Sequence, residues 1–501
     1  MRLSGVAVAC CLFSIFAIAV KPVTDPDFWW HLATGRYIAT HHVIPHHDVF
    51  SLTAQDHVWI THEWVTELLF YGGWLLGGTK LLSVITAAVI TLSFGIVYLT
   101  ARERGATPLV STAIVAIAAL ASAHTWGTRP QMLSLLLTAL YGLGISRMIV
   151  RKYPAPPIWM PLIMVVWVNL HGGFIFGLAL LAIATTAYVL QDRLWAVRSP
   201  EPFDGREVEA PRVPDVRRCA VIVGLTACAT LVNPNGLSGA LYPLSYLGNN
   251  ASTRYIAEWV SPDFHKTEYL FFEALLLVLL VGALTGPRRA RLVDVSIILP
   301  FLYLAFESVR NISLFAVLGA PITAEVVTKA LPASWQRARR RRPAVRGKTI
   351  MNWLAVIILG TGITATTFGK LTDTAQAHAT ATMYPVGALR YLKTHDHPVR
   401  GFDSYNWGGF LIWNWYSSQR VFIDGRPDMY GDTFMDRYVR AYNGDASWRS
   451  LFAVNRFCYA LVEPSSGIAN VLRSTPGWSQ VYHDTVSALF VLTNPRPHCE
   501  G

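Results

Sequence analysis

Residues 24–64 read TDPDFWWHLATGRYIATHHVIPHHDVFSLTAQDHVWITHEW. This stretch lies between the first apolar run of the chain and the next one. It holds five acidic residues, four tryptophans and seven of the fifteen histidines of the chain. A plain connector between two apolar segments does not need so many ionisable and aromatic groups. We therefore interpret residues 21–64 as a functional loop.

Two helices are expected around this loop. Asp25 followed by Pro26 is typical of a helix N-cap with proline at the first helical position. The apolar spacing that follows predicts an amphipathic helix on a membrane surface, through Phe28, Trp29, Leu32, Tyr37 and Ile38. A second surface helix is predicted over residues 63–76, with a bend marked by Gly72, Gly73, Gly77 and Gly78.

The whole chain is unusually apolar, since 52% of its 501 residues are hydrophobic and only 15% are charged. Repeated apolar runs of about 20 residues predict a polytopic α-helical membrane protein with about 11 transmembrane helices. The predicted spans are 4–20, 80–100, 107–124, 131–149, 157–169, 173–190, 218–233, 268–285, 292–306, 312–329 and 350–369.

The net charge of +11 does not indicate nucleic-acid binding, because the basic residues occupy short loops between apolar runs. Those loops all fall on one side when the spans are drawn as above, which is the positive-inside pattern. The basic loops are 102–104, 147–152, 193–218, 288–291 and 337–348. Because the basic loops lie on the cytoplasmic side, the N-terminus is predicted to be cytoplasmic. After an odd number of spans, the C-terminal segment is predicted to be extracytoplasmic.

The chain is expected to have two domains. Residues 1–370 would form the transmembrane domain that carries the loop 21–64, and residues 371–501 would form an extracytoplasmic α/β domain. In the second domain we predict helices over 384–394 and 432–441 and strands over 410–415, 420–423, 458–462 and 488–493. Cys458 and Cys499 would both lie outside, and either form a disulfide or stay as free thiols.

Asp25 and Asp27 are the first candidates for chemistry. Two carboxylates one residue apart can divide the work, with one taking a proton from an acceptor hydroxyl and the other orienting that acceptor or a cation. The alternative is purely structural: Asp25 caps the following helix and Asp27 stabilises its positive end.

His62 and Glu63 precede the second surface helix, and we expect Glu63 to act in catalysis and His62 to contact the substrate. The pair would also suit a metal site, so a divalent cation is a possible cofactor whose ligands the sequence leaves unknown. Solvated polar residues are the alternative. The histidines at positions 41, 42, 46 and 47 fit no fixed ligand spacing.

Polar groups near the ends of later spans are expected to gather at the outer membrane surface. Charges at such boundaries usually face a cavity or a partner. A guanidinium holds two phosphate oxygens at once, which favours Arg310, and after it Arg129, as phosphate ligands. An ion pair between Glu307 and Arg310 is the alternative. The remaining members of the set are His124, Trp126, Asn169, His171, Asn233, Asn235, Glu258, Trp259 and Asn311. We expect His171 and Glu307 to contact the substrate.

Asp424, Arg426 and Asp428 follow a hydrophobic segment of the C-terminal domain. Polar residues at the end of a strand often bind ligands in α/β domains, so these three are candidate substrate contacts. The alternative is an Asp-Gly turn locked by an ion pair between aspartate and arginine.

The architecture resembles the GT-C class of integral membrane glycosyltransferases, which includes protein mannosyltransferases, aminoarabinose transferases and oligosaccharyltransferases. The stretches that look like an uncharacterised bacterial branch of this class are DPDFWWHLATGRYI, HEW, NLHGGFIFG and NWGGFLIWNWYSSQRVFIDGRPDMYG. The resemblance implies a polyprenyl-phosphate sugar donor, with Asp25 or Asp27 as the acidic residue of the first outer loop. The second acidic motif of metal-dependent members has no clear match, and the Trp-Trp-Asp-Tyr-Gly signature of oligosaccharyltransferases is absent.

The resemblance thus implies transfer of a sugar to a lipid or glycan acceptor at the outer face of a bacterial cytoplasmic membrane. Two other functions stay open. A transporter or flippase for a lipid-linked saccharide would need no carboxylate placed for chemistry, although transporters often show inverted repeats and we find none. A non-enzymatic membrane scaffold would leave the outer-face polar groups unexplained.

Overall fold

The computed structural model describes residues 3–55, 57–196, 214–246, 251–286, 290–332, 346–395, 399–416 and 418–493. Two compact units make up the chain. Unit 1 consists of Met1–Lys21, Ser83–Ser245 and Ala257–Gly369, and unit 2 of Pro22–Leu82, Tyr246–Ile256 and Lys370–Gly501. Cys458 is disulfide-bonded, whereas Cys499 and most of the predicted basic loops 193–218 and 337–348 lie outside the described residues.

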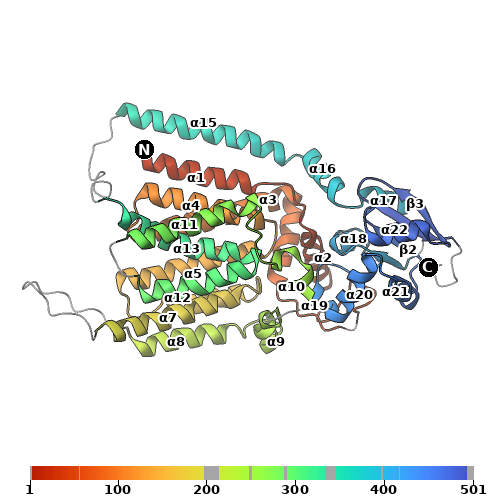
Figure 1. The fold of residues 1–501 in the computed structure, drawn as a ribbon, viewed down its shortest axis with the longest axis horizontal. Helices are drawn as coiled ribbons and strands as arrows, with labels where there is room; N and C mark the ends of the chain where they lie inside the picture. Colours follow the sequence, from red (N-terminus) through yellow and green to blue (C-terminus); the bar gives the residue numbers. More distant parts are fainter. Residues whose placement is uncertain are drawn as a thin grey trace, which may run out of the picture. The chain divides into compact units, whose positions relative to one another are not determined.

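Unit 1 is a bundle of helices whose long members run alongside one another (Figure 1). Its central helix α13 (Ile312–Ala330) packs against four others and is buried along most of its length. These neighbours are α4 (Pro108–Ser122), α5 (Gln131–Arg151), α11 (Leu270–Thr285) and α12 (Leu292–Glu307). The other helices are α1 (Leu3–Ala19), α6 (Trp159–Trp167), α7 (Phe174–Ala196), α8 (Val216–Ala229), α9 (Gly236–Leu241) and α15 (Arg346–Lys370), with single 3₁₀ turns between some of them.

Six helical segments among the described residues are long and apolar enough to cross a membrane. They are Trp64–Glu103, Pro108–Thr125, Gln131–Arg151, Phe174–Gln191, Thr267–Thr285 and Val309–Ala330. The chain is therefore a polytopic helical membrane protein. The other predicted spans coincide with shorter or less apolar helices, so the number of eleven stays a prediction.

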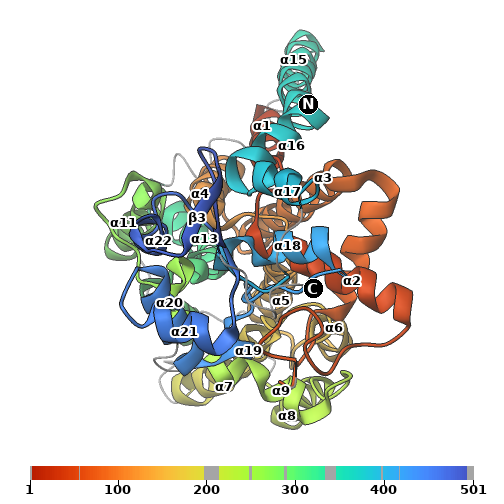
Figure 2. The same ribbon diagram turned by 90° about the vertical axis from the view of Figure 1, so that its right-hand side faces the viewer.

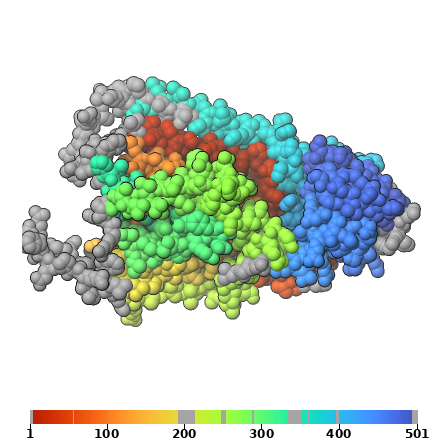
Figure 3. All heavy atoms as spheres, in the orientation of Figure 1, coloured from red at the N-terminus to blue at the C-terminus, as the bar shows by residue number. Residues whose placement is uncertain are grey.

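The outward face of α11 is apolar, which suits contact with lipid. Large side chains that it exposes are Leu277, Leu280, Val281 and Leu284. Segments drawn in green, which include this helix, cover much of the face of unit 1 that Figure 3 turns to the viewer. A soluble protein would bury such side chains, whereas hydrocarbon chains solvate them.

Unit 2 begins with the two helices that the sequence predicted. In α2 (Pro26–His41), the Asp25 side chain caps the first turn by accepting a hydrogen bond from the backbone N–H of Asp27. Helix α3 (Trp64–Glu103) starts in unit 2 and is kinked at Gly77 and Gly78. Gly78 has a positive φ of 61°, a conformation that glycine adopts without strain. The predicted cap and bend are thus confirmed.

The C-terminal part of unit 2 contains a mixed four-stranded sheet of order β1-β2-β4-β3. Its strands are β1 (Gly401–Asp403), β2 (Tyr459–Val462), β3 (Trp478–His483) and β4 (Ala488–Leu492). Strand β1 is parallel to β2, while β4 is antiparallel to β2 and β3. The helices of unit 2 after α3 are α10 (Ala251–Tyr255), α16 (Asp373–Met383), α17 (Val386–Leu392), α18 (Gly408–Trp415), α19 (Pro427–Tyr430), α20 (Asp432–Tyr442), α21 (Trp448–Asn455) and α22 (Gly467–Ser474).

The core of unit 2 joins the first loop to residues more than 350 positions later. Trp29 of α2 makes edge contacts with Tyr384 and Phe410, which stack on each other at 4.5 Å. The Tyr384 hydroxyl donates to the Thr24 carbonyl at 2.7 Å. Helices α2 and α18 lie side by side, as Figure 2 shows. The first loop is therefore part of the same folded unit as the C-terminal segment.

Two predicted strands are wrong. Residues 410–415 belong to helix α18, because the apolar run packs one face against α2 and a short apolar run does not by itself distinguish helix from strand. Residues 420–423 contribute only an isolated bridge between Val421 and Ser51. The predicted helices at 384–394 and 432–441 and the strands at 458–462 and 488–493 are confirmed within one or two residues, as α17, α20, β2 and β4.

Gly401 in β1 has no room for a side chain, because a Cβ there would overlap the buried ring of Tyr459 on β2. We expect Gly401→Ala to lower the stability of unit 2 by about 1–3 kcal/mol, the usual cost of overpacking a core. Denaturant unfolding in detergent, followed by tryptophan fluorescence, measures this. Gly72→Ala is the matched control, since a Cβ at Gly72 meets nothing within 4 Å. Equal stability of the two variants would contradict the tight β1–β2 contact.

Candidate functional site

The carboxylates of Asp25 and Asp27 have different surroundings at the start of α2. Asp25 Oδ1 accepts the N–H of Asp27 at 3.0 Å, which is the helix cap. Asp27 Oδ1 accepts the indole N–H of Trp30 at 3.3 Å. Both side chains are half-buried rather than enclosed. Asp25 thus performs the structural role foreseen as the alternative, while Asp27 is held beside an aromatic ring.

Two glycines of the C-terminal segment, Gly409 and Gly425, let the chain approach this helix closely, and a third, Gly408, lets α18 approach residues 423–424. A Cβ on Gly425 would overlap Oδ1 of Asp27. A Cβ on Gly409 would come within 2.7 Å of the Pro26 carbonyl, and one on Gly408 within 2.5 Å of Asp424 Cα. The motif NWGGF therefore acts through close packing. It brings the loop of residues 424–428 next to Asp27, so the structure joins two motifs that are far apart in the sequence.

Asp424 and Arg426 of this loop form a buried ion pair. The guanidinium donates from Nε to Asp424 Oδ1 at 2.7 Å and from Nη2 to Asp424 Oδ2 at 2.6 Å. Nη2 also lies 2.9 Å from Oδ1 of Asp48, and Tyr430 donates to Asp424 at 2.7 Å. Asp424, Arg426 and Asp48 are 0%, 3% and 4% exposed. This is the locked turn that the sequence left as the alternative to substrate contact, whereas Asp428 is exposed.

Asp48 makes the stability of unit 2 dependent on pH. Burial alone would raise its pKa, but the Arg426 guanidinium and hydrogen bonds from Ser51 and Phe50 hold the pKa of this carboxyl below its ordinary value. When folding lowers the pKa of a carboxyl group, its ionised form stabilises the folded protein. This stabilisation is complete at pH values above the pKa that the group has in the unfolded chain. That stabilisation is lost as the pH falls through the folded-state pKa.

We therefore expect the free energy of unfolding of unit 2 to fall as the pH decreases below the ordinary aspartate pKa of about 4. The fall should be smaller in Asp48→Asn, because the amide does not titrate. Denaturant unfolding at a series of pH values, with wild type and variant side by side, checks this. Identical pH profiles would show that Asp48 does not carry the effect.

Tyr405 is a further polar group near these carboxylates. Burial raises the pKa of its hydroxyl well above the ordinary value, and the negative charges of Asp27, Asp424 and Asp428 raise it further. The Tyr405 hydroxyl therefore keeps its proton, and the charges of three carboxylates act on it. Sequence analysis missed it, although it opens the aromatic motif YNWGGF that was singled out.

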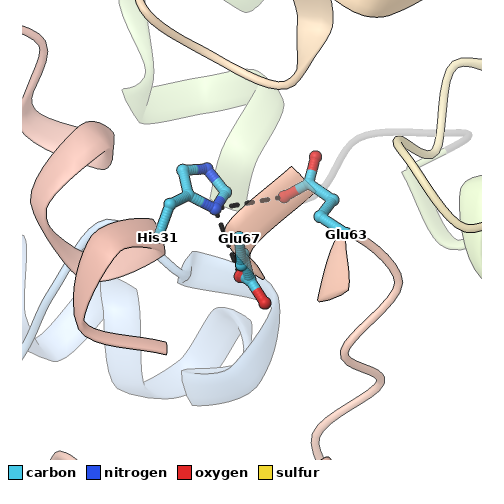
Figure 4. Close-up of side chains that lie close together, drawn as sticks. All are labelled: His31, Glu63 and Glu67. Carbon is cyan, nitrogen blue, oxygen red and sulfur yellow. Dashed lines mark hydrogen bonds and ion pairs between the residues drawn. The ribbon is translucent and has the colours of Figure 1, made fainter. Parts of the chain in front are cut away.

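A second cluster lies where α2 meets α3, and Figure 4 shows its three side chains. His31 Nδ1 lies 3.2 Å from Glu67 Oε1 and 3.6 Å from Glu63 Oε2. His62 Nε2 lies 3.6 Å from the other oxygen of Glu63. Glu63 is thus buried between two histidines, and its predicted catalytic role stays a prediction. Sequence analysis missed His31 and Glu67; the four-residue spacing of Glu63 and Glu67 was the available signal.

The candidate arginines of unit 1 surround Glu258. Arg129 forms an ion pair with Glu258, and the guanidinium of Arg310 stacks on Trp259 at 4.5 Å from the ring centroid. Burial raises the pKa of Glu258, but Arg129 and Arg310 lower it more, so the carboxyl has a lowered pKa. Four of the predicted end-of-span residues, Arg129, Glu258, Trp259 and Arg310, therefore lie together within unit 1.

The two other candidates of unit 1 have ordinary local partners. Glu307 is exposed at the end of α12 and accepts a hydrogen bond from the Tyr303 hydroxyl. His171 Nδ1 lies 2.8 Å from Ser134 Oγ and accepts the backbone N–H of Gly173 at 2.9 Å. His171 therefore shapes the turn between α6 and α7, and its predicted contact with substrate stays untested.

No protein-family model matches the sequence, and no curated protein sequence matches it either. Solved structures do resemble it. The archaeal oligosaccharyltransferase AglB from Archaeoglobus fulgidus, in complex with an inhibitory peptide and a dolichol-phosphate, has a TM-score of 0.52 and 12% identity, covering 92% of this chain and 69% of that chain. The apo form of the A. fulgidus oligosaccharyltransferase has a TM-score of 0.51 and 11% identity over the same shares.

ArnT from Cupriavidus metallidurans in the apo state has a TM-score of 0.49 and 14% identity, over 95% of both chains. At such low identities a likeness shows the fold alone, and here the two oligosaccharyltransferase structures carry it. The apolar helices of unit 1 agree with them. The chain therefore has the fold of the GT-C class of integral membrane glycosyltransferases, which its sequence motifs resemble.

Proposed function

We propose that this protein is a membrane glycosyltransferase that moves a sugar from a polyprenyl-phosphate carrier to a hydroxyl of a lipid or glycan acceptor. The shared fold supports the class of reaction. One of the similar proteins was solved with a dolichol-phosphate, which supports a polyprenyl-phosphate carrier for this chain as well. The site of action would be the outer face of a bacterial cytoplasmic membrane.

The observation that carries the proposal is the placement of Asp27. Its half-buried carboxylate is held between the Trp30 indole N–H and the backbone of Gly425, next to the protonated phenol of Tyr405. Asp25 caps the helix, so Asp27 is the better candidate for general base. Aromatic side chains beside a carboxylate also suit the apolar face of a sugar ring.

In the proposed reaction the acceptor oxygen attacks the anomeric carbon of the sugar while its proton passes to the Asp27 carboxylate. The bond between the anomeric carbon and the phosphate oxygen breaks, and its electron pair leaves with polyprenyl phosphate. A fixed cation stabilises the charge that develops on the leaving oxygen, and Arg310, with Arg129 as the runner-up, stays the sequence-based prediction for that role. No metal is needed for this balance of atoms and charge.

The test is sugar transfer by purified protein in lipid nanodiscs from a panel of radiolabelled polyprenyl-phosphate sugars. We expect one donor to be consumed, with release of polyprenyl phosphate and appearance of label in the acceptor lipid or glycan. A panel in which every donor binds and none is consumed would contradict the proposal. It would favour a transporter or a scaffold instead.

A further inference from the structure

The joint between α2 and α3 brings three metal-ligating side chains together within unit 2. His31 lies on α2, Glu63 directly precedes α3, and Glu67 lies in its first turn. The Glu67 N–H donates to the Glu63 carbonyl at 3.0 Å, so the two glutamates follow one another on the same face of the helix.

The close approach of the two helices depends on a glycine. A Cβ at Gly35, one turn after His31, would overlap the backbone carbonyl of Glu67. This contact sets the distance between α2 and α3. The close packing of the two helix backbones therefore places the His31 imidazole near both carboxylates.

The two ligand separations measured from His31 are close to those of a small tetrahedral cation. One nitrogen of His31 and one oxygen of each glutamate all lie within 4.8 Å of one another. Metal–ligand bonds of about 2.0–2.2 Å give tetrahedral ligand–ligand distances of roughly 3.3–3.6 Å. The distances from His31 Nδ1, 3.2 Å to Glu67 and 3.6 Å to Glu63, bracket that range. Figure 4 shows both carboxylates directed at the same ring nitrogen.

The charge of the cluster also calls for a cation. His31, Glu63 and Glu67 are 3%, 7% and 1% exposed, and Glu67 Oε2 has no hydrogen-bond partner among the residues that the structure describes. His31 lies between the two carboxylates, and His62 lies 3.6 Å from Glu63. Burying carboxylates is costly, and a divalent cation bound between them would offset that cost for both.

We propose that His31, Glu63 and Glu67 form a binding site for a first-row divalent cation, with Zn²⁺ preferred. Imidazole is a favoured ligand of Zn²⁺, and two carboxylates complete three protein ligands, which leaves a fourth position for water. His62, 3.6 Å from Glu63, orients that carboxylate. The cation clamps α2 to α3 and so positions the loop that carries Asp25 and Asp27.

The experiment uses full-length protein purified without a histidine tag, stripped with a chelator and titrated with Zn²⁺ and, separately, Mn²⁺. We expect wild type to bind about one equivalent of Zn²⁺ and Zn²⁺ to raise its unfolding temperature. Glu67→Gln keeps the size of the side chain but removes its charge, and should weaken Zn²⁺ binding more than about 100-fold. The exposed histidines provide the control: the double variant His41→Gln, His42→Gln should bind like wild type.

Wild type that binds neither cation after stripping would overturn the proposal and show that Glu67 is simply a protonated partner of His31. Equal affinity of wild type and Glu67→Gln would also overturn it. The thermal shift of wild type alone keeps the test valid if the variant does not fold. Neither readout depends on sugar transfer, so failure here is distinguishable from failure of the proposed activity.

Discussion

Arg426→Met is expected to destabilise unit 2 by about 3–5 kcal/mol, the usual cost of removing one partner from a buried ion pair. Arg426 faces two buried carboxylates, Asp424 and Asp48, and its guanidinium lies 4.5 Å from the centre of the Trp59 ring. Methionine fills much of the same space. It therefore removes the charge that compensates the aspartates without opening a large cavity.

Arg420→Met provides the matched control for this prediction. Arg420 is exposed six residues earlier, and a surface substitution of this kind changes stability by no more than about 0.5 kcal/mol. Both variants are measured by denaturant unfolding in detergent. If Arg426→Met proves as stable as Arg420→Met, then the buried ion pairs do not hold the first loop to the loop of residues 424–428.

Asp27→Asn is expected to lower the rate of sugar transfer by about 10²–10⁴-fold, the range that general-base catalysis contributes. The amide still accepts the Trp30 indole N–H, so the local structure should persist while the base is lost. Radiolabelled transfer under saturating donor measures the change, and donor binding by the variant should stay close to that of wild type.

Asp25→Asn separates catalysis from capping. Asparagine caps a helix as well as aspartate does, so transfer by this variant should stay within about threefold of wild type. A collapse of activity in Asp25→Asn with none in Asp27→Asn would assign the base to Asp25. Full activity in both variants would show that neither carboxylate carries the chemistry.

Local signals in the sequence predicted much of the fold. Asp25-Pro26 and the glycines at 77 and 78 gave the start of α2 and the kink of α3, because caps and positive φ angles depend on a few neighbouring residues. Long apolar runs likewise predicted the six described helices that are long and apolar enough to cross a membrane. The run 410–415 was assigned to a strand because its helical conformation depends on packing against α2, which the sequence does not display.

The make-up of the candidate site was harder to predict, because it depends on long-range contacts. Asp48 meets Arg426 across nearly 380 residues, and α2 joins the C-terminal segment in one unit. His31 was missed because it stands inside an aromatic helix face, where a histidine is unremarkable. Glu67 was missed because it interrupts an apolar run whose membrane character dominates the pattern.

The central claim is that the chain breaks a glycosidic bond rather than moving an intact lipid-linked sugar. The most direct measurement follows donor cleavage and donor movement across the bilayer in the same vesicles, with wild type and Asp27→Asn side by side. We expect wild type to release polyprenyl phosphate and Asp27→Asn to bind donor without cleaving it. Intact donor that crosses the bilayer at equal rates with both proteins, without any release of polyprenyl phosphate, would contradict the claim.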